Sequence, residues 1–141
     1  MKRISALALL AIASMAACTG AIGQQPVIKA NIPFNFTVGN SWMPAGEYTI
    51  SSPLQQVILF RSADLAKTAT VVSTHSYNES DSGSKLVFDK YGDQYFLHRV
   101  LCPSITSLNL DVPQGAAARK ARSRFLEAKL YKGEEILVAA K

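Results

Sequence analysis

Short segments of alternating polarity, divided by turn residues, restrict the fold of this chain more than any other feature. In segment 28–38 every second residue from Ile32 to Val38 is apolar, and Pro33 interrupts the alternation. Period two with aromatic and β-branched residues predicts half-buried strands, and the proline predicts an edge position or a bulge there. Similar segments follow at 47–51, 57–60, 68–75, 85–91 and 94–101.

Turn residues separate these segments. Pro44-Ala45-Gly46 predicts a tight turn, and Gly92-Asp93 predicts a two-residue hairpin connection of type II′ or I′. Five or six strands at about 8–12-residue spacing without intervening helices predict a mainly β fold, a single antiparallel β-sandwich or small barrel. The Ala-, Arg-, Lys- and Leu-rich segment 115–132, which ends before Gly133, predicts one C-terminal α-helix.

The first residues predict export. Lys2 and Arg3 precede an apolar run over 4–17 and a small-residue exit, which are the three parts of a secretory signal. The run is shorter than the roughly 20 residues that a permanent membrane helix needs, and no second such run follows it. We therefore expect residues 1–23 to be a signal peptide and 24–141 to form one exported domain, periplasmic or extracellular, with no transmembrane span after processing.

Two cleavage chemistries fit the leader. Ala21-Ile22-Gly23 places small side chains where signal peptidase requires them, and cleavage there leaves Gln24 first. Met15-Ala16-Ala17-Cys18 resembles a lipoprotein box instead, in which Cys18 would be lipidated and anchor the domain at the envelope. Either route leaves Cys102 as the only free thiol of the processed protein, because Cys18 is removed or lipidated. Because it follows the apolar pair Val100-Leu101, we expect it to be buried.

Two blocks of the chain resemble a group of small exported bacterial proteins. These proteins share an opening I-P-F-x-F-x-V-G followed by P-A-G-x-Y, which stands here at 32–39 and 44–48. The later block from 85 to 97 is similar to their second block. The resemblance covers residues 28–101 and implies a β-rich exported domain without implying a particular chemistry. The Pro-Ala-Gly-Glu-Tyr turn alone is also similar to turns of transthyretin-like and immunoglobulin-like sandwiches.

A search for catalytic motifs favours a non-catalytic protein. Nucleophilic catalysis needs a hydroxyl or thiol beside an oriented base, and the chain has no Gly-x-Ser-x-Gly elbow. His75 and His98 are the two available bases, and both fall in predicted strands, where a structural role is commoner. With Asp89 and Asp93 they are the candidate metal ligands, but the two histidines are not at ligand spacing, so we predict no metal. No phosphate-cradling or dinucleotide motif occurs, so we predict no cofactor.

Two features indicate binding. Trp42 lies in a predicted loop, where an indole either stacks on a sugar or protein partner or caps the end of the sandwich. The C-terminal segment 114–141 carries the excess positive charge of the mature chain. Four basic residues of its predicted helix, which we call the helix cations, are the candidates for binding: Arg119, Lys120, Arg122 and Arg124. They could dock on an anionic envelope lipid or polysaccharide, or they could form a solvated helix face. Nucleic acid is a poor partner for an exported protein.

These features together predict a non-catalytic binding or structural module of the cell envelope or periplasm. The alternative is a small exported hydrolase whose site is assembled across strands.

Overall fold

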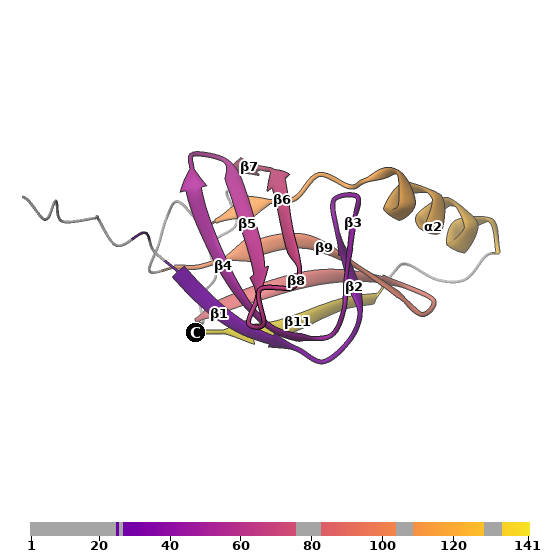
Figure 1. Cartoon of the computed structure of the whole chain (residues 1–141). Helices are drawn as coiled ribbons and strands as arrows, with labels where there is room; N and C mark the ends of the chain where they lie inside the picture. The colour runs from indigo at the N-terminus through magenta and orange to yellow at the C-terminus, as the bar shows by residue number, and fades with distance from the viewer. Residues whose placement is uncertain (1–24, 26, 76–82, 104–108, 129–133) are drawn as a thin grey trace, which may run out of the picture.

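The alternating segments pair into one sheet that rolls up on itself (Figure 1). The computed structural model describes residues 25, 27–75, 83–103, 109–128 and 134–141. Its strands are β1 (Val27–Ile32), β2 (Phe36–Val38), β3 (Ser41–Met43), β4 (Gly46–Leu54), β5 (Val57–Ser62), β6 (Thr68–Val72), β7 (Thr74–His75), β8 (Ser84–Tyr91), β9 (Gln94–Leu101), β10 (Leu110–Asp111) and β11 (Glu134–Ala140). Helix α2 (Ala116–Glu127) lies outside the sheet.

The predicted mainly β fold with one C-terminal helix is confirmed, and the structure selects the barrel over the sandwich. Neighbouring strands follow the order β3-β2-β9-β8-β11-β1-β4-β5-β6, a nearly closed barrel-like sheet of nine strands. Strand β10 pairs with both β9 and β7, and β7 follows β6 after one residue. This bridge returns the sheet path from β7 to β9, just after the end of β6.

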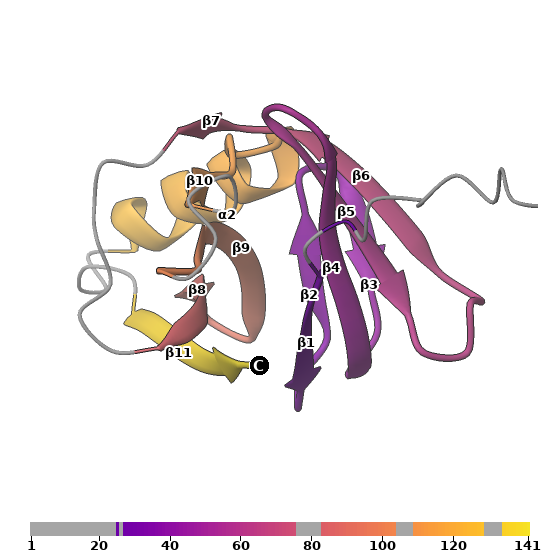
Figure 2. The same cartoon turned by 90° about the vertical axis from the view of Figure 1, so that its left-hand side faces the viewer.

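Pro33 marks a corner of the barrel, which corrects the expectation of an edge or a bulge. Strand β1 ends at Ile32 and lies between β4 and β11, whereas β2 begins at Phe36 and lies between β3 and β9. Because proline has no N–H to give to a ladder, the pairing ends there. The chain then leaves the pairing with β4 and reaches β9 through β2. Figure 2 shows β1 and β4 in one wall of the barrel and β8, β9 and β11 in the other.

Aromatic side chains fill the space between the walls. Phe36 is 1% exposed, and its ring lies 5.2 Å from Tyr48, 5.4 Å from Phe88 and 6.2 Å from Phe60. The two closer contacts are edge-to-face, the geometry that the ring quadrupole favours. The Tyr48 hydroxyl donates to the carbonyl oxygen of Pro44 at 2.6 Å, which ties the predicted tight turn to the core.

The predicted hairpin around Gly92-Asp93 is confirmed. Strands β8 and β9 pair up to Tyr91 and Gln94, and Gly92 has a φ of 64°. The pairing of the two strands changes register between Phe88 and Val87, since Phe88 is opposite Leu97 and Val87 is opposite Arg99. His98 is therefore the extra residue of a β-bulge, which aims its side chain at the outer face of the hairpin.

Helix α2 covers part of the outer face of this hairpin. It runs from Ala116 to Glu127 with Ala128 as its C-cap, against a predicted span of 115–132; residues 129–133 lie outside the described residues. Ala118 is its one buried residue among those described, and the Phe125 ring lies 5.9 Å from Tyr91. The helix therefore packs on the barrel through a narrow apolar face that includes Ala118 and Phe125.

Candidate functional site

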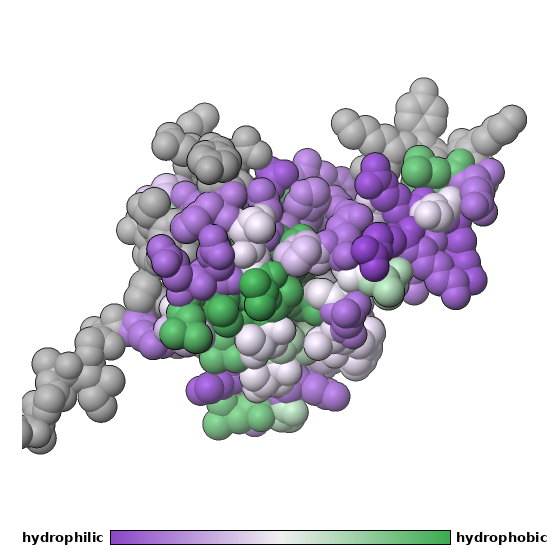
Figure 3. Space-filling view, turned by 90° about the horizontal axis from the view of Figure 1, so that it is seen from above, coloured by the Kyte–Doolittle hydropathy of each residue, from purple (hydrophilic) through white to green (hydrophobic). Residues whose placement is uncertain are grey.

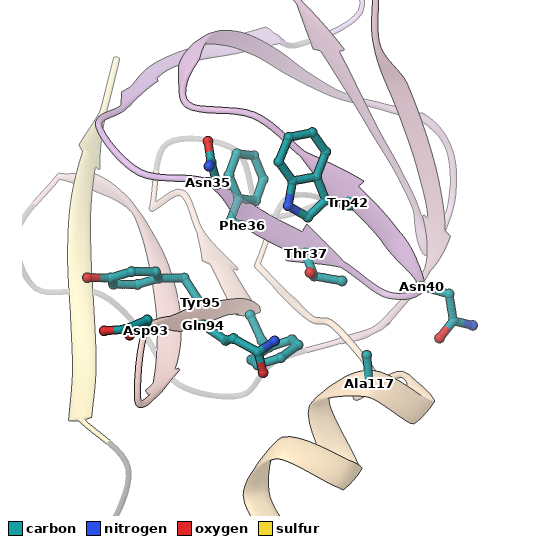
Figure 4. A pocket seen from close by; sticks show the side chains of 10 residues that line it. Asn35, Phe36, Thr37, Asn40, Trp42, Asp93, Gln94, Tyr95 and Ala117 are labelled. Carbon is teal, nitrogen blue, oxygen red and sulfur yellow. The ribbon is translucent and has the colours of Figure 1, made fainter.

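An open groove of about 400 Å³ lies on the outer surface between the β2–β3 hairpin, the β8–β9 turn and the start of α2 (Figure 4). We call it the Trp42 groove. Cross-strand pairing builds its floor, because Trp42 is opposite Thr37 in β3 and β2, and Thr37 is opposite Phe96 in β9. Its lining residues are Asn35, Phe36, Thr37, Asn40, Trp42, Asp93, Gln94, Tyr95, Phe96 and Ala117.

Trp42 forms one side of this groove. Its side chain is 57% exposed, and Figure 4 shows the indole facing across the open space from Gln94 and Ala117. The residue is part of strand β3, which corrects the expected loop position. An exposed indole on a groove combines a large apolar surface with one N–H donor.

Hydrogen bonds fix the amides of the groove in a defined orientation. The Oδ1 atom of Asn35 accepts from the Ala45 backbone N at 2.9 Å, and that of Asn40 accepts from the Ala116 backbone N at 3.2 Å. Because a backbone N–H can only donate, both carbonyl oxygens are occupied and both side-chain NH₂ groups remain as donors. Asp93 adds acceptors and Gln94 adds both kinds of group. The groove therefore combines an aromatic face with donors and acceptors.

Two glycines bring α2 close enough to wall the groove. Gly39 turns the β2–β3 hairpin with a φ of 59°. Gly115 precedes the helix and packs against that turn, where an added Cβ would overlap the Gly39 carbonyl oxygen and the Asn40 Oδ1 atom. Asn40 thus supplies the helix N-terminus with the side-chain cap that Gly115 lacks.

A second polar cluster surrounds His98 on the β8–β9 hairpin. Its Nδ1 atom lies 2.7 Å from Asp89 Oδ2, which also accepts from Gln114 Nε2 at 3.2 Å. The hydrogen bond to Asp89 raises the pKa of His98 above its usual value, while burial and the Arg99 charge oppose the increase. Arg99 in turn forms an ion pair with Asp111 at 2.8 Å.

This cluster holds half of a catalytic arrangement. Asp89 orients the His98 ring as a triad carboxylate would, but Nε2, the atom that would act as the base, has Arg99 Nη2 at 3.4 Å as its contact. His75 lies exposed in β7. Cys102 is buried as predicted, with the Ser84 hydroxyl 3.1 Å from its sulfur. None of the hydrogen bonds among the described residues joins His75 or Cys102 to His98, so the His98–Asp89 pair has no thiol as its partner.

The helix cations are all exposed but do not share one site. Arg119 lines a cavity of about 430 Å³ next to Gly39–Ser41 and β6, whereas Arg124 lines a cavity of about 400 Å³ beside the β8–β9 turn. The two residues thus lie on opposite flanks of α2. The view from above shows the α2 end of the molecule as mostly hydrophilic (Figure 3). This arrangement is compatible with a solvated helix as well as with docking.

Sequence reasoning found Trp42 but missed the amides around it. Nothing beside Asn35, Asn40 or Gln94 in the sequence indicates a role in binding. The one available signal was the I-P-F-N-F block, in which an asparagine stands between two core aromatics. Asp93, considered as a metal ligand, lies in the groove. Within the described parts of the chain, His, Cys, Asp and Glu side chains do not gather into a group that could hold a metal ion.

None of the helical residues that the structure describes belongs to a helix long and apolar enough to traverse a bilayer. Cys18 and the leader lie outside the described residues. Comparison of the chain with protein-family models, curated proteins and solved structures finds no match.

Proposed function

We propose that this protein is an exported, non-catalytic binding module of the cell envelope or periplasm, and that the Trp42 groove is its binding site. The observation that carries the proposal is an indole that is 57% exposed over a groove of about 400 Å³. Burying such a surface against a ligand stabilises the complex, and the oriented amides select its polar groups. The resemblance to small exported bacterial proteins and the leader at 1–23 support export.

Intrinsic fluorescence tests this proposal directly, because Trp42 is the single tryptophan of the chain. We expect one class in a panel of soluble polysaccharides, peptides and phospholipid vesicles to change the emission in a saturable way. Calorimetry with Trp42→Ala should show a loss of that binding by at least tenfold. Leu137→Ala is the matched control, since Leu137 is 59% exposed on β11 and should bind normally. Equal binding by wild type and Trp42→Ala would refute the groove as the site.

The export part of the proposal has a separate test. Mass spectrometry of the protein purified from its native host should show Gln24 as the first residue, or Cys18 with an acyl mass if the lipoprotein box is used. A chain that keeps Met1 through Gly23 and remains inside the cell would contradict export without affecting the groove.

The alternative function is a small hydrolase, which the His98–Asp89 contact favours. Under that alternative, a compound of the panel should be turned over, and His98→Ala should abolish the turnover. We favour binding because the Nε2 atom of His98 faces Arg99 and no nucleophile among the described residues contacts it.

A further inference from the structure

A second cavity continues the Trp42 groove past the β8–β9 turn. It measures about 400 Å³ and shares Asp93 and Gln94 with the first. Its other walls are Tyr91 and Gly92 of the hairpin and one flank of α2, where small side chains leave room for a ligand. That flank consists of Ala121, Arg124, Phe125 and Ala128. Ala117 of the first cavity stands one helical turn before Ala121, so the two cavities share one side of the helix.

The two residues that the cavities share, Asp93 and Gln94, are polar, and each cavity has aromatic lining of its own: Trp42, Tyr95 and Phe96 in the first, Tyr91 and Phe125 in the second. Trp42 stands at one end, while Tyr91 and Phe125, with ring centroids 5.9 Å apart and both half-buried, stand at the other. In the floor of the first cavity, the paired residues Trp42, Thr37 and Phe96 cross from β3 through β2 to β9. At the usual spacing of neighbouring strands, Trp42 and Phe96 are roughly 10 Å apart along this row. Tyr91 lies beyond that row on β8. Asp93 and Gln94 fall between the two aromatic ends.

We propose, resting on the function proposed above, that the ligand is a linear polysaccharide chain that occupies both cavities. A sugar ring has an apolar C–H face and a hydroxyl-bearing edge. One ring stacks on Trp42, and a second lies against Tyr91 and Phe125, with Arg124 at its edge. Asp93 and Gln94 bond the hydroxyls between the two rings. A peptide that added as a strand would pair with the free edge of β3, the last strand of the sheet path. It would lie at the Trp42 end only, because β3 contributes no residue to the second cavity.

A chain-length series tests this proposal. The probes are β-1,4-linked glucose oligomers and β-1,4-linked N-acetylglucosamine oligomers of one to six units, measured by Trp42 fluorescence and by calorimetry. In the series that binds, we expect affinity to increase at least tenfold between the short oligomers and those of four to six units, and then to level off. The increase is expected because only the longer chains reach both aromatic ends.

Variants on α2 separate the two cavities. Arg124→Ala should weaken the longest oligomers about tenfold and leave the shortest unchanged, because Arg124 lines only the second cavity. Arg122→Ala is the matched control, since Arg122 is exposed on the same helix and lines neither cavity. Trp42→Ala should weaken oligomers of every length.

The outcomes distinguish this proposal from the one on which it rests. Affinity that is independent of chain length, or an equal effect of Arg124→Ala on short and long oligomers, would overturn the two-cavity proposal but leave the Trp42 groove as a site. Failure of both oligomer series to bind would also overturn it. In that case a fluorescence response to peptides or vesicles that requires Trp42 would still support the binding module.

Discussion

Replacing Gly115 by alanine should detach α2 from the barrel and open the Trp42 groove. Alanine in a helix end normally costs little, and loss of a glycine reduces the entropy of the unfolded chain. Here the added Cβ would meet the Gly39 carbonyl oxygen and the Asn40 Oδ1 atom, and would lie 2.8 Å from the Gly39 carbonyl carbon. Two of these atoms belong to the backbone of a tight turn and cannot rotate away.

The cost follows from these contacts. Forcing extra volume into a packed contact costs about 1–3 kcal/mol, and displacing Asn40 from the Ala116 N–H removes a cap of about 1 kcal/mol. The unfolded-state gain returns about 0.4–1 kcal/mol. We therefore expect Gly115→Ala to lower the free energy of unfolding by about 2 kcal/mol. At roughly 4 °C per kcal/mol for a domain of this size, the Tm should fall by about 8 °C.

Thermal unfolding and hydrogen exchange measure the two parts of this effect. The Tm reports the loss of stability, and exchange should be faster in 116–127 while the strands of the barrel keep their protection. Asn40→Ala isolates the cap and should cost about 1 kcal/mol. Gly115→Ala should cost less in the Asn40→Ala background than alone, because one of the overlapping atoms is then absent.

One result would refute this reasoning. If Gly115→Ala left the Tm unchanged or raised it, and exchange in 116–127 stayed the same, the contact between Gly39 and Gly115 would not be what positions the helix. The groove wall at Ala117 would then depend on Ala118 and Phe125 alone.

Three other perturbations test separate parts of the structure. The pKa of His98 is raised in the folded state, so its contribution to stability is complete below the unfolded value near 6.5 and is lost as the pH rises through the folded pKa. Urea unfolding of the wild type should show this loss of stability between acidic and mildly alkaline pH. The loss should be smaller in Asp89→Asn. Gly92→Ala should cost about 1 kcal/mol because φ is 64° with no atom nearby, and a chevron or urea midpoint that does not move would contradict the turn geometry. Changing all four helix cations to glutamine should weaken salt-sensitive binding to anionic vesicles, and vesicle binding that persists unchanged would exclude docking through α2.

Local patterns in the sequence determined the elements. The alternation in 28–38 placed Ile32, Phe36 and Val38 on one face of a strand, and all three are buried. The Gly92-Asp93 hairpin and the helix start before Ala116 also follow from neighbouring residues alone. These features are readable because the period of a strand, the φ of a glycine and the propensity of alanine act over a few positions.

The tertiary structure decided how these elements meet. Nothing near Thr37 in the chain indicates that it pairs in parallel with Phe96, and nothing near Gly115 indicates the turn at Gly39 that requires a glycine there. Closure of the barrel depends on such non-local pairings, which compete with other registers of similar local quality until the whole core is packed. Trp42 could therefore be selected from the sequence, whereas the groove around it exists only because strands and a helix distant in the chain converge on one face.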